Sequence, residues 1–209
     1  MAQPQLEPGV QARVLEAATG LFARKGYHAT SVREIVEAAG VTKPVLYYWF
    51  RSKEGVFQAI MQAAVEAHRA TLAEVRASGG TAAERILQLT ERVMALVLEH
   101  ADVVRALDAV YYGPREDAPS IDFDSLYGEF DACLGEFLAE GVRGGEFRGD
   151  DIEAMHLALL GSFLICKASI HINEETARCG CEQPLDPLNV RRITAVVLDG
   201  MRTGKEEQR

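Results

Sequence analysis

The apolar residues of this chain recur at spacings of three and four over most of its length, and stretches that alternate between apolar and polar residues are absent. Such spacing gathers apolar side chains on one face of a helix. The pattern predicts helices over about 52–77, from 81 onward, and over about 102–112, 121–140, 150–171 and 186–201. Together with shorter helices nearer the N-terminus, it predicts an all-α protein of about nine helices.

Residues 30–54 predict two short helices joined by a tight turn. Ser31 can cap the first helix within a capping box, and Gly40 can supply the left-handed residue that ends it. Thr42 can cap the second helix, and Pro44 lies in its first turn, where a missing N–H group costs nothing. A turn this short is typical of a helix-turn-helix, whose second helix enters the major groove of DNA.

The second of these helices carries side chains that are unusual for a protein core. Leu46 and Phe50 are four residues apart and are expected to face inward, which leaves a lysine, a proline, two tyrosines and Trp49 for the other faces. Phenol and indole groups can donate to DNA phosphates, and apolar groups can contact thymine methyls. The alternative is that these aromatic rings pack on their own domain, and Trp49 in particular can fill a gap between helices.

Residues 10–56 resemble the DNA-binding domain of the TetR (tetracycline repressor) family. The residues that carry the resemblance are Ala17, Ala18, Leu21, Phe22, Gly26, Tyr27, Ala29, Thr30, Ser31, Ile35, Ala38, Ala39, Gly40, Val41, Thr42, Leu46, Tyr47, Tyr48, Phe50, Lys53 and Glu54. The chain departs from the family at Trp49, where histidine is usual, and at Pro44, where many members have glycine. The resemblance implies a three-helix DNA-binding domain, followed by a helical domain for ligand binding and dimerisation.

The same resemblance implies which residues contact DNA. The positions that touch phosphates are occupied here by Ser31, Thr42, Tyr47, Tyr48 and Lys53, and Trp49 replaces a common phosphate-binding histidine. The positions that meet base edges are occupied by Lys43, Pro44 and Val45. Arg33 matches a position from which arginine can reach guanine. The alternative for Arg33 is an ion pair with Glu37, four residues later on the same helix.

The charge of the chain is unevenly distributed. The whole chain has a net charge of -9, yet residues 1–55 carry seven basic against five acidic residues. An acidic body behind a slightly basic DNA-binding domain favours few, specific phosphate contacts over broad attraction to nucleic acid. We expect flexible tails at 1–9 and 204–209, a DNA-binding domain at 10–56, and an effector-binding and dimerisation domain at 57–203.

The two C-terminal helices are apolar on most of their faces, over about 156–170 and 190–201. Such helices must be covered on most faces. In the TetR family the corresponding helices pack against their copies as a four-helix dimer interface, whereas the alternative is burial within one subunit. The expected interface residues are Leu160, Gly161, Phe163, Leu164, Lys167, Ile193, Val196 and Val197. A two-fold dimer would present two DNA-binding domains to a palindromic operator.

The middle of the chain is rich in aromatic residues. In the family the central helices surround a ligand cavity, so the resemblance implies a pocket for a small, partly apolar effector. The expected pocket residues are His100, Arg105, Asp108, Tyr111, Tyr127, Phe130, His156 and Phe163. The alternative is that the rings are ordinary core and the polar groups lie at the surface.

Other functions find less support in the sequence. Cys179 and Cys181 could form a redox couple or bind metal, but no second cysteine pair accompanies them, so no metal or cofactor is expected and a thiol-responsive regulator stays an alternative. The motifs of common enzyme classes are absent, and an enzyme is not expected. A helical adaptor without operator binding is a further alternative.

The location of the protein follows from its apolar segments. No apolar run typical of an export signal follows the first methionine, and the run at 157–166 is expected to be too short to cross a bilayer. We therefore expect a cytoplasmic homodimer without a membrane partner. It would be a repressor, rather than an activator, that binds DNA and is released by its effector.

Overall fold

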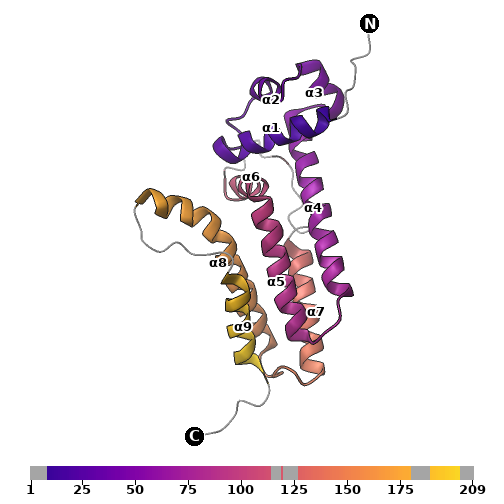
Figure 1. Cartoon of the computed structure of the whole chain (residues 1–209), viewed down its shortest axis with the longest axis vertical. Coiled ribbons are helices and arrows are strands. Elements are labelled where there is room, and N and C mark those ends of the chain that lie inside the picture. Colours follow the sequence, from indigo (N-terminus) through magenta and orange to yellow (C-terminus); the bar gives the residue numbers. More distant parts are fainter. Residues whose placement is uncertain (1–8, 114–118, 120–126, 180–188, 203–209) are drawn as a thin grey trace. The chain divides into compact units, whose positions relative to one another are not determined.

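The computed structural model describes residues 9–113, 119, 127–179 and 189–202, and within 170–179 it describes the backbone alone. These residues form nine helices, with an isolated bridge between Phe147 and Arg202, so the expected all-α fold is confirmed (Figure 1). The chain divides into two compact units. Residues 1–66 and 100–122 form unit 1, and residues 67–99 and 123–209 form unit 2.

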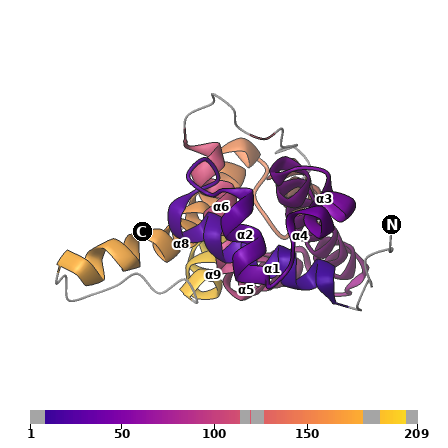
Figure 2. The same ribbon diagram turned by 90° about the horizontal axis from the view of Figure 1, so that it is seen from above.

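Unit 1 contains the N-terminal helices and one later helix. It comprises α1 (Val10–Lys25), α2 (Val32–Ala39), α3 (Lys43–Phe50), the first part of α4 (Lys53–Ala77) and α6 (Ala101–Tyr111). Both α2 and α6 pack against α1, as Figure 2 shows from above. The compact units therefore divide the chain differently from the domains expected at 10–56 and 57–203, because α6 joins the N-terminal helices.

Local hydrogen bonds define the turn between α2 and α3. The Ser31 side chain accepts from the backbone N–H of Glu34, and the Glu34 side chain accepts from the backbone N–H of Ser31, which completes the expected capping box. Gly40 has φ 64°, and the N–H of Val41 donates to the carbonyl of Val36 at 3.0 Å. Because glycine adopts this left-handed conformation without a steric penalty, the turn forms where the sequence predicts it.

Unit 2 is a helical bundle around a continuous apolar core. It comprises the second part of α4, α5 (Ala82–Glu99), α7 (Glu129–Arg143), α8 (Ile152–Cys179) and α9 (Val190–Met201). The start of α5 is capped twice: Thr81 and Glu84 form the expected capping box, and the Glu146 carboxylate accepts from the N–H groups of Ala82 and Ala83 at 2.8 and 3.0 Å. The loop after α7 is thereby tied to α5.

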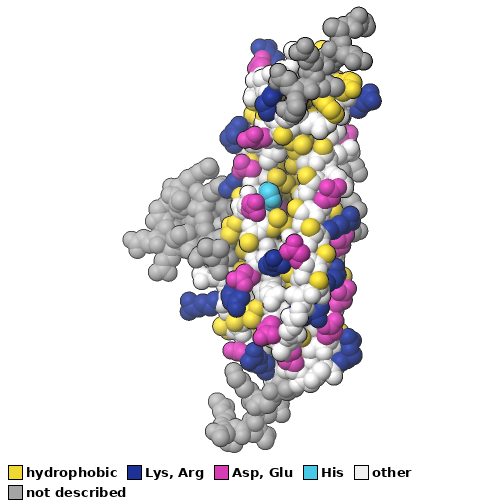
Figure 3. Space-filling model, turned by 45° about the vertical axis from the view of Figure 1, so that its right-hand side comes forward, with side chains coloured by type: hydrophobic (Ala, Val, Ile, Leu, Met, Phe, Trp, Pro, Cys, Tyr) yellow, Lys and Arg dark blue, Asp and Glu magenta, His cyan; other side chains and the backbone are white. Residues whose placement is uncertain are grey.

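Ion pairs lie along the outer surface of unit 2. Arg69 pairs with Glu129 at 2.7 Å, and Arg76, two turns later on α4, pairs with Glu136 at 3.0 Å. Positive and negative side chains are interspersed on the face shown in Figure 3. Exposed ion pairs contribute little to stability, so the buried apolar residues hold the bundle together.

Several helix boundaries differ from the prediction. The helix expected at 121–140 is described from Glu129 and continues to Arg143, while 120–126 lie outside the described residues. α8 was expected to end near residue 171 but continues to Cys179, and its last turns extend away from α9 in both ribbon views (Figures 1 and 2). Cys179 therefore ends a helix instead of lying in a connection.

The length of α8 also changes the membrane argument. Among the described residues, the segment Ile152–Ser169 is long and apolar enough to span a bilayer, with a mean hydropathy of 1.3 over 18 residues. The shorter run at 157–166, which was expected to be too short to cross a bilayer, lies within this longer apolar segment. Length and composition do not distinguish a membrane span from the core helix of a water-soluble bundle, and α8 packs against α5, α7 and α9.

Candidate DNA-binding, dimer and effector sites

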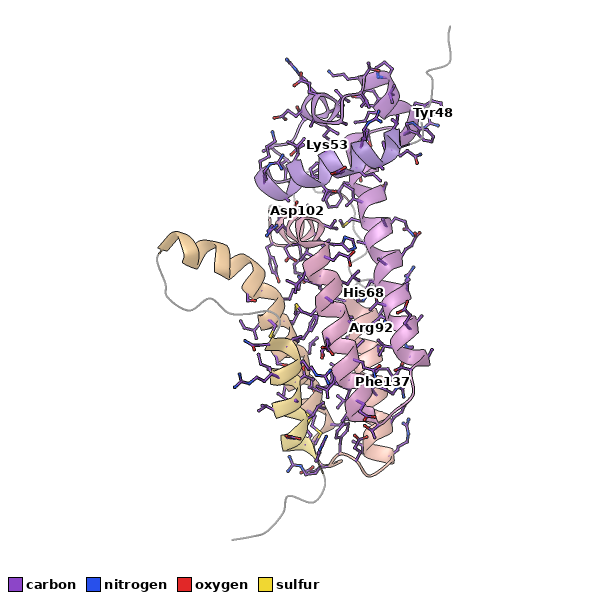
Figure 4. All side chains as sticks on the ribbon, viewed as in Figure 1. Tyr48, Lys53, His68, Arg92, Asp102 and Phe137 are labelled. Atoms are coloured by element: carbon purple, nitrogen blue, oxygen red, sulfur yellow. The ribbon has the colours of Figure 1, made fainter. Side chains whose placement is uncertain are left out.

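The outer face of α3 exposes aromatic side chains. Leu46 and Phe50 are buried, as expected, whereas Tyr47 and Tyr48 are 44% and 54% exposed. Figure 4 shows Tyr48 at the outer edge of the helix, pointing away from the ribbon. Both phenol groups can therefore reach a partner without a change in the core of unit 1.

The first turn of α3 is also open to solvent. Thr42 is the N-cap residue, and its hydroxyl makes no capping hydrogen bond. Lys43 and Pro44 are exposed, and Val45 is half-buried. This turn leaves a hydroxyl, an ammonium group and an apolar ring at the surface, which are groups that suit phosphates and base edges.

Trp49 is placed differently from the expectation. Its ring packs edge-on against Tyr48, with centroids 5.3 Å apart, and its Nε1 is buried with no hydrogen-bond partner among the described residues. An N–H group buried in this way cannot donate to a phosphate in this conformation. The indole therefore packs on its own domain, which is the alternative raised from the sequence.

Arg33 lies near the start of α2 and pairs with Glu37. Its Nε donates to Glu37 Oε1 at 2.7 Å, and the hydrogen-bonded carboxylate raises the pKa of Arg33. The two side chains are 75% and 60% exposed. Because exposed pairs are weak, Arg33 can exchange Glu37 for an acceptor on DNA at little cost.

Ser31 is occupied by the capping box. Its hydroxyl donates to Glu34 Oε2 at 2.8 Å, and its backbone N–H donates to the same oxygen at 2.9 Å. Lys25 of α1 pairs with the other oxygen of Glu34, and these hydrogen bonds, that of Lys25 first, lower the pKa of Glu34 to about 2. In this conformation Ser31 has neither donor available for the phosphate contact expected of it.

Lys53 is occupied as well. Its Nζ donates to the backbone carbonyls of Tyr27 and Thr30 at 2.9 and 3.0 Å and lies 4.1 Å from the centre of the Tyr27 ring. Burial lowers the pKa of Lys53. Figure 4 shows this lysine beside α1, within unit 1. The ammonium group expected to bind a phosphate thus binds the turn between α1 and α2.

One face of α8 and α9 exposes apolar side chains. Leu157, Leu164, Ile165 and Val196 are 61%, 42%, 52% and 69% exposed. A Cβ atom added at Gly161 would meet nothing within 4 Å. Gly161, Leu164 and Val196 were among the residues expected in the dimer interface, whereas Leu157 and Ile165 lie in the predicted apolar helix but were not expected in that interface.

Other residues expected at the dimer surface lie further inside. Leu160, Ile193 and Val197 are half-buried against the core of unit 2. Phe163 and Lys167 are buried, 5% and 9% exposed, and Lys167 Nζ donates to the Tyr127 hydroxyl at 3.0 Å. Phe163 and Lys167 thus face the interior of unit 2, toward Phe130 and Tyr127, and their expected place in the dimer interface stays a prediction.

Comparison with known proteins identifies the N-terminal region. Residues 14–60 match the family model described as bacterial regulatory proteins, tetR family. The chain belongs to the TetR family. Like other members, it is a DNA-binding transcriptional regulator, and the relatives found are regulators, not enzymes.

Similar proteins extend over nearly the whole chain. The transcriptional repressor KstR2 of Rhodococcus jostii is 27% identical over 92% of this chain and 91% of its own. The solved structure of the ketosteroid regulator KstR2 of Mycobacterium tuberculosis has 22% identity and a TM-score of 0.71, covering 95% and 97% of the two chains. A putative fatty acid metabolism regulator of Clostridium perfringens has 23% identity and a TM-score of 0.68, covering 92% and 100%. These two structures share the TetR fold with this chain.

The eight residues expected in the effector pocket are divided between the two units. His100, Arg105, Asp108 and Tyr111 belong to unit 1, and Tyr127, Phe130, His156 and Phe163 belong to unit 2. In unit 1, Asp108 is buried and Tyr111 is 47% exposed. Arg105 pairs with Asp102 at 2.6 Å, one turn earlier on α6.

The four residues in unit 2 lie in different surroundings. Phe130 and Phe163 stack with centroids 4.6 Å apart, and each is 5% exposed. His156 Nε2 lies 2.8 Å from an oxygen of Asp131, and that carboxylate is 49% exposed. The two phenylalanines are thus the apolar pair of the expected set, whereas the His156 ring lies against the Asp131 carboxylate.

Proposed function

We propose that this TetR-family regulator is a repressor that binds a palindromic operator as a homodimer and leaves DNA when a small, partly apolar molecule occupies its helical body. The observation that carries the proposal is the outer face of α3. Tyr47, Tyr48 and the first turn of the helix lie in solvent, while Leu46 and Phe50 anchor its inner face in the core.

The geometry supports different roles in DNA binding for different exposed residues. Thr42, Tyr47 and Tyr48 carry hydroxyl groups that can donate to phosphates, which fixes the domain on the duplex. Lys43, Pro44 and Val45 occupy the first turn of α3, whose side chains meet base edges. Arg33 can leave Glu37 to bind guanine with two parallel hydrogen bonds, which adds about 1–3 kcal/mol of discrimination against other bases.

The apolar face of α8 and α9 supports the homodimer. A large apolar surface exposed to water is unfavourable, and a second copy can cover it through a two-fold axis. An exposed glycine within a helix costs about 1 kcal/mol relative to alanine, but it permits close approach of another backbone. Gly161 lies within this face and has open space around it.

The position of α6 supports release by an effector. Helix α6 packs against α1 within unit 1, so a displacement of α6 would act on the DNA-binding helices. The relatives named for ketosteroids and fatty acids suggest a ligand of similar apolar character. A tenfold to hundredfold loss of operator affinity requires about 1.4–2.8 kcal/mol of coupling.

The test is selection of bound duplexes from a random library by the purified protein at a fixed salt concentration, because affinity depends steeply on salt. A palindrome with two half-sites is the expected result, and its genomic neighbours would supply candidate effectors for release assays. If no duplex is enriched at low salt while a protein partner is captured, the chain is instead a helical adaptor.

The proposed function also implies where the protein acts. A regulator of this family acts on chromosomal DNA, so we place the protein in the cytoplasm.

A thiol-responsive regulator is the second candidate, based on Cys179 and Cys181 in the sequence. Treatment with peroxide would separate the two, since unchanged operator binding after oxidation would remove the thiol mechanism.

A further inference from the structure

One side chain of α4 holds the turn between α1 and α2. Lys53 is the first residue of α4, and its Nζ donates to the carbonyl oxygens of Tyr27 and Thr30 at 2.9 and 3.0 Å. Thr30 is 1% exposed, and its hydroxyl donates to the carbonyl of Gly26 at 2.8 Å. The lysine therefore binds both ends of the turn that leads directly into α2, at two residues, Tyr27 and Thr30, that are themselves buried.

An aromatic ring also lies beside the ammonium group. The Tyr27 ring, centred 4.1 Å from Nζ, packs against Phe22 and Phe57 with centroids 5.4 and 5.3 Å apart. Phe57 lies one turn after Lys53 on α4, so that helix holds Tyr27 at two points. An ammonium group has three N–H donors, two of which bind carbonyls here, and the ring attracts the cation through its negatively polarised face.

This environment differs from that of a lysine that binds a phosphate. A phosphate-binding lysine keeps its ammonium group hydrated until DNA replaces the water. For Lys53 to reach a phosphate, it would have to abandon two carbonyl oxygens that belong to the turn before α2. The Lys53 side chain is half-buried, and this partial burial lowers the pKa of its ammonium group.

We propose that Lys53 is a positioning residue for DNA binding: its ammonium group fixes the turn that places the first residues of α2, including Arg33, and forms no ion pair with a DNA phosphate. The proposal rests on the operator binding proposed above. It assigns the contribution of this lysine to the placement of neighbouring groups instead of to direct neutralisation of DNA charge.

Salt dependence distinguishes these two roles. Each phosphate that a protein neutralises releases counterions, so the slope of log K against log salt changes by about 0.9 per contact. A dimer that lost one phosphate contact in each DNA-binding domain would show a slope smaller by about 1.8. Loss of a positioning residue lowers affinity at every salt concentration and leaves the slope unchanged.

The experiment compares wild type with Lys53→Met in the full-length protein, on the operator duplex obtained by library selection. The active fraction of each protein is first measured by stoichiometric titration, and circular dichroism confirms the folded state well below the melting temperature. Lys43→Met is the matched control, since it removes an exposed ammonium group at the start of α3. Lys53→Arg, which retains donors for both carbonyls, tests rescue.

The expected result for Lys53→Met is a loss of about tenfold in the affinity of the active protein, with the slope of wild type. Lys53→Arg should recover part of that loss. A slope reduced by about 1.8 would overturn the proposal in favour of a phosphate contact. Unchanged affinity of the active protein would overturn it in favour of a purely structural role. Wild-type binding in the same titration tests the proposed function separately.

Discussion

We expect Val196→Arg to weaken the proposed dimer, because Val196 lies on the exposed face of α8 and α9. The exposed fractions of Leu157, Leu164, Ile165 and Val196 together equal a little more than two fully exposed side chains. Burying one such side chain contributes about 1.5–3 kcal/mol, so covering the face contributes about 3–7 kcal/mol per subunit. In a symmetric dimer both copies contribute, which is enough to offset much of the cost of association.

Replacement of Val196 removes the most exposed of these side chains from each subunit. At 69% exposure, its burial is worth about 1–2 kcal/mol in each copy, or about 2–4 kcal/mol per dimer. The dimer dissociation constant should therefore rise by about 30-fold to 1000-fold, before the added cost of two facing arginines. Sedimentation equilibrium measures this constant, and operator binding should weaken at protein concentrations at which the dimer dissociates.

The matched control is Ala73→Arg, which adds the same side chain to an exposed site on α4 in unit 2. This control should keep the dimer and the operator affinity of wild type. If Val196→Arg also remained dimeric with unchanged operator binding, the assignment of this face to the dimer interface would be refuted. Circular dichroism of both variants separates dissociation from unfolding.

Three other outcomes are expected. Tyr47→Phe should lower the affinity for all DNA sequences alike, by about tenfold, since each DNA-binding domain loses one hydrogen bond to a phosphate. A changed base preference in the library selection would contradict this role. Gly141→Ala should lower unfolding free energy by about 1–3 kcal/mol, because its Cβ would lie 2.3 Å from the Phe147 ring; a wild-type denaturant midpoint would argue against this contact. The pKa of Glu34 is lowered to about 2, so the stability that its carboxylate contributes is present above about pH 4.5 and is lost as pH falls toward 2. Glu34→Gln should therefore reduce the acid dependence of the melting temperature. A pH profile identical to that of wild type would exclude this contribution of Glu34.

The local signals in the sequence predicted the helix-turn-helix with good accuracy. The capping box at Ser31 and the left-handed Gly40 both form as expected, and the helices begin and end within a residue or two of the predicted positions. These features depend on hydrogen bonds between residues at most five apart, so a short segment contains all the partners. The C-terminal end of α8 was harder to predict, because the sequence around Cys179 carries no strong capping signal.

The roles of individual side chains depended on partners far away in the sequence. Lys53 resembles a phosphate-binding lysine in its local motif, yet its ammonium group binds Tyr27 and Thr30, more than twenty residues earlier. Lys167 lies in an apolar stripe that suggested an exposed interface, but it turns inward to Tyr127, forty residues earlier. Helical periodicity indicates which residues share a face, but it does not identify what covers that face.

The sequence by itself determined the all-α class, the helix-turn-helix and the side chains available at the start of α3, because these follow from spacing and local hydrogen bonds. Tertiary structure alone decided which of these side chains are available to DNA. The indole N–H of Trp49 is buried, and the ammonium group of Lys53 binds carbonyls within the domain, while Tyr47 and Tyr48 stay in solvent. A donor can serve only one strong acceptor at a time, and which acceptor is nearest is fixed by the packing of helices distant in sequence.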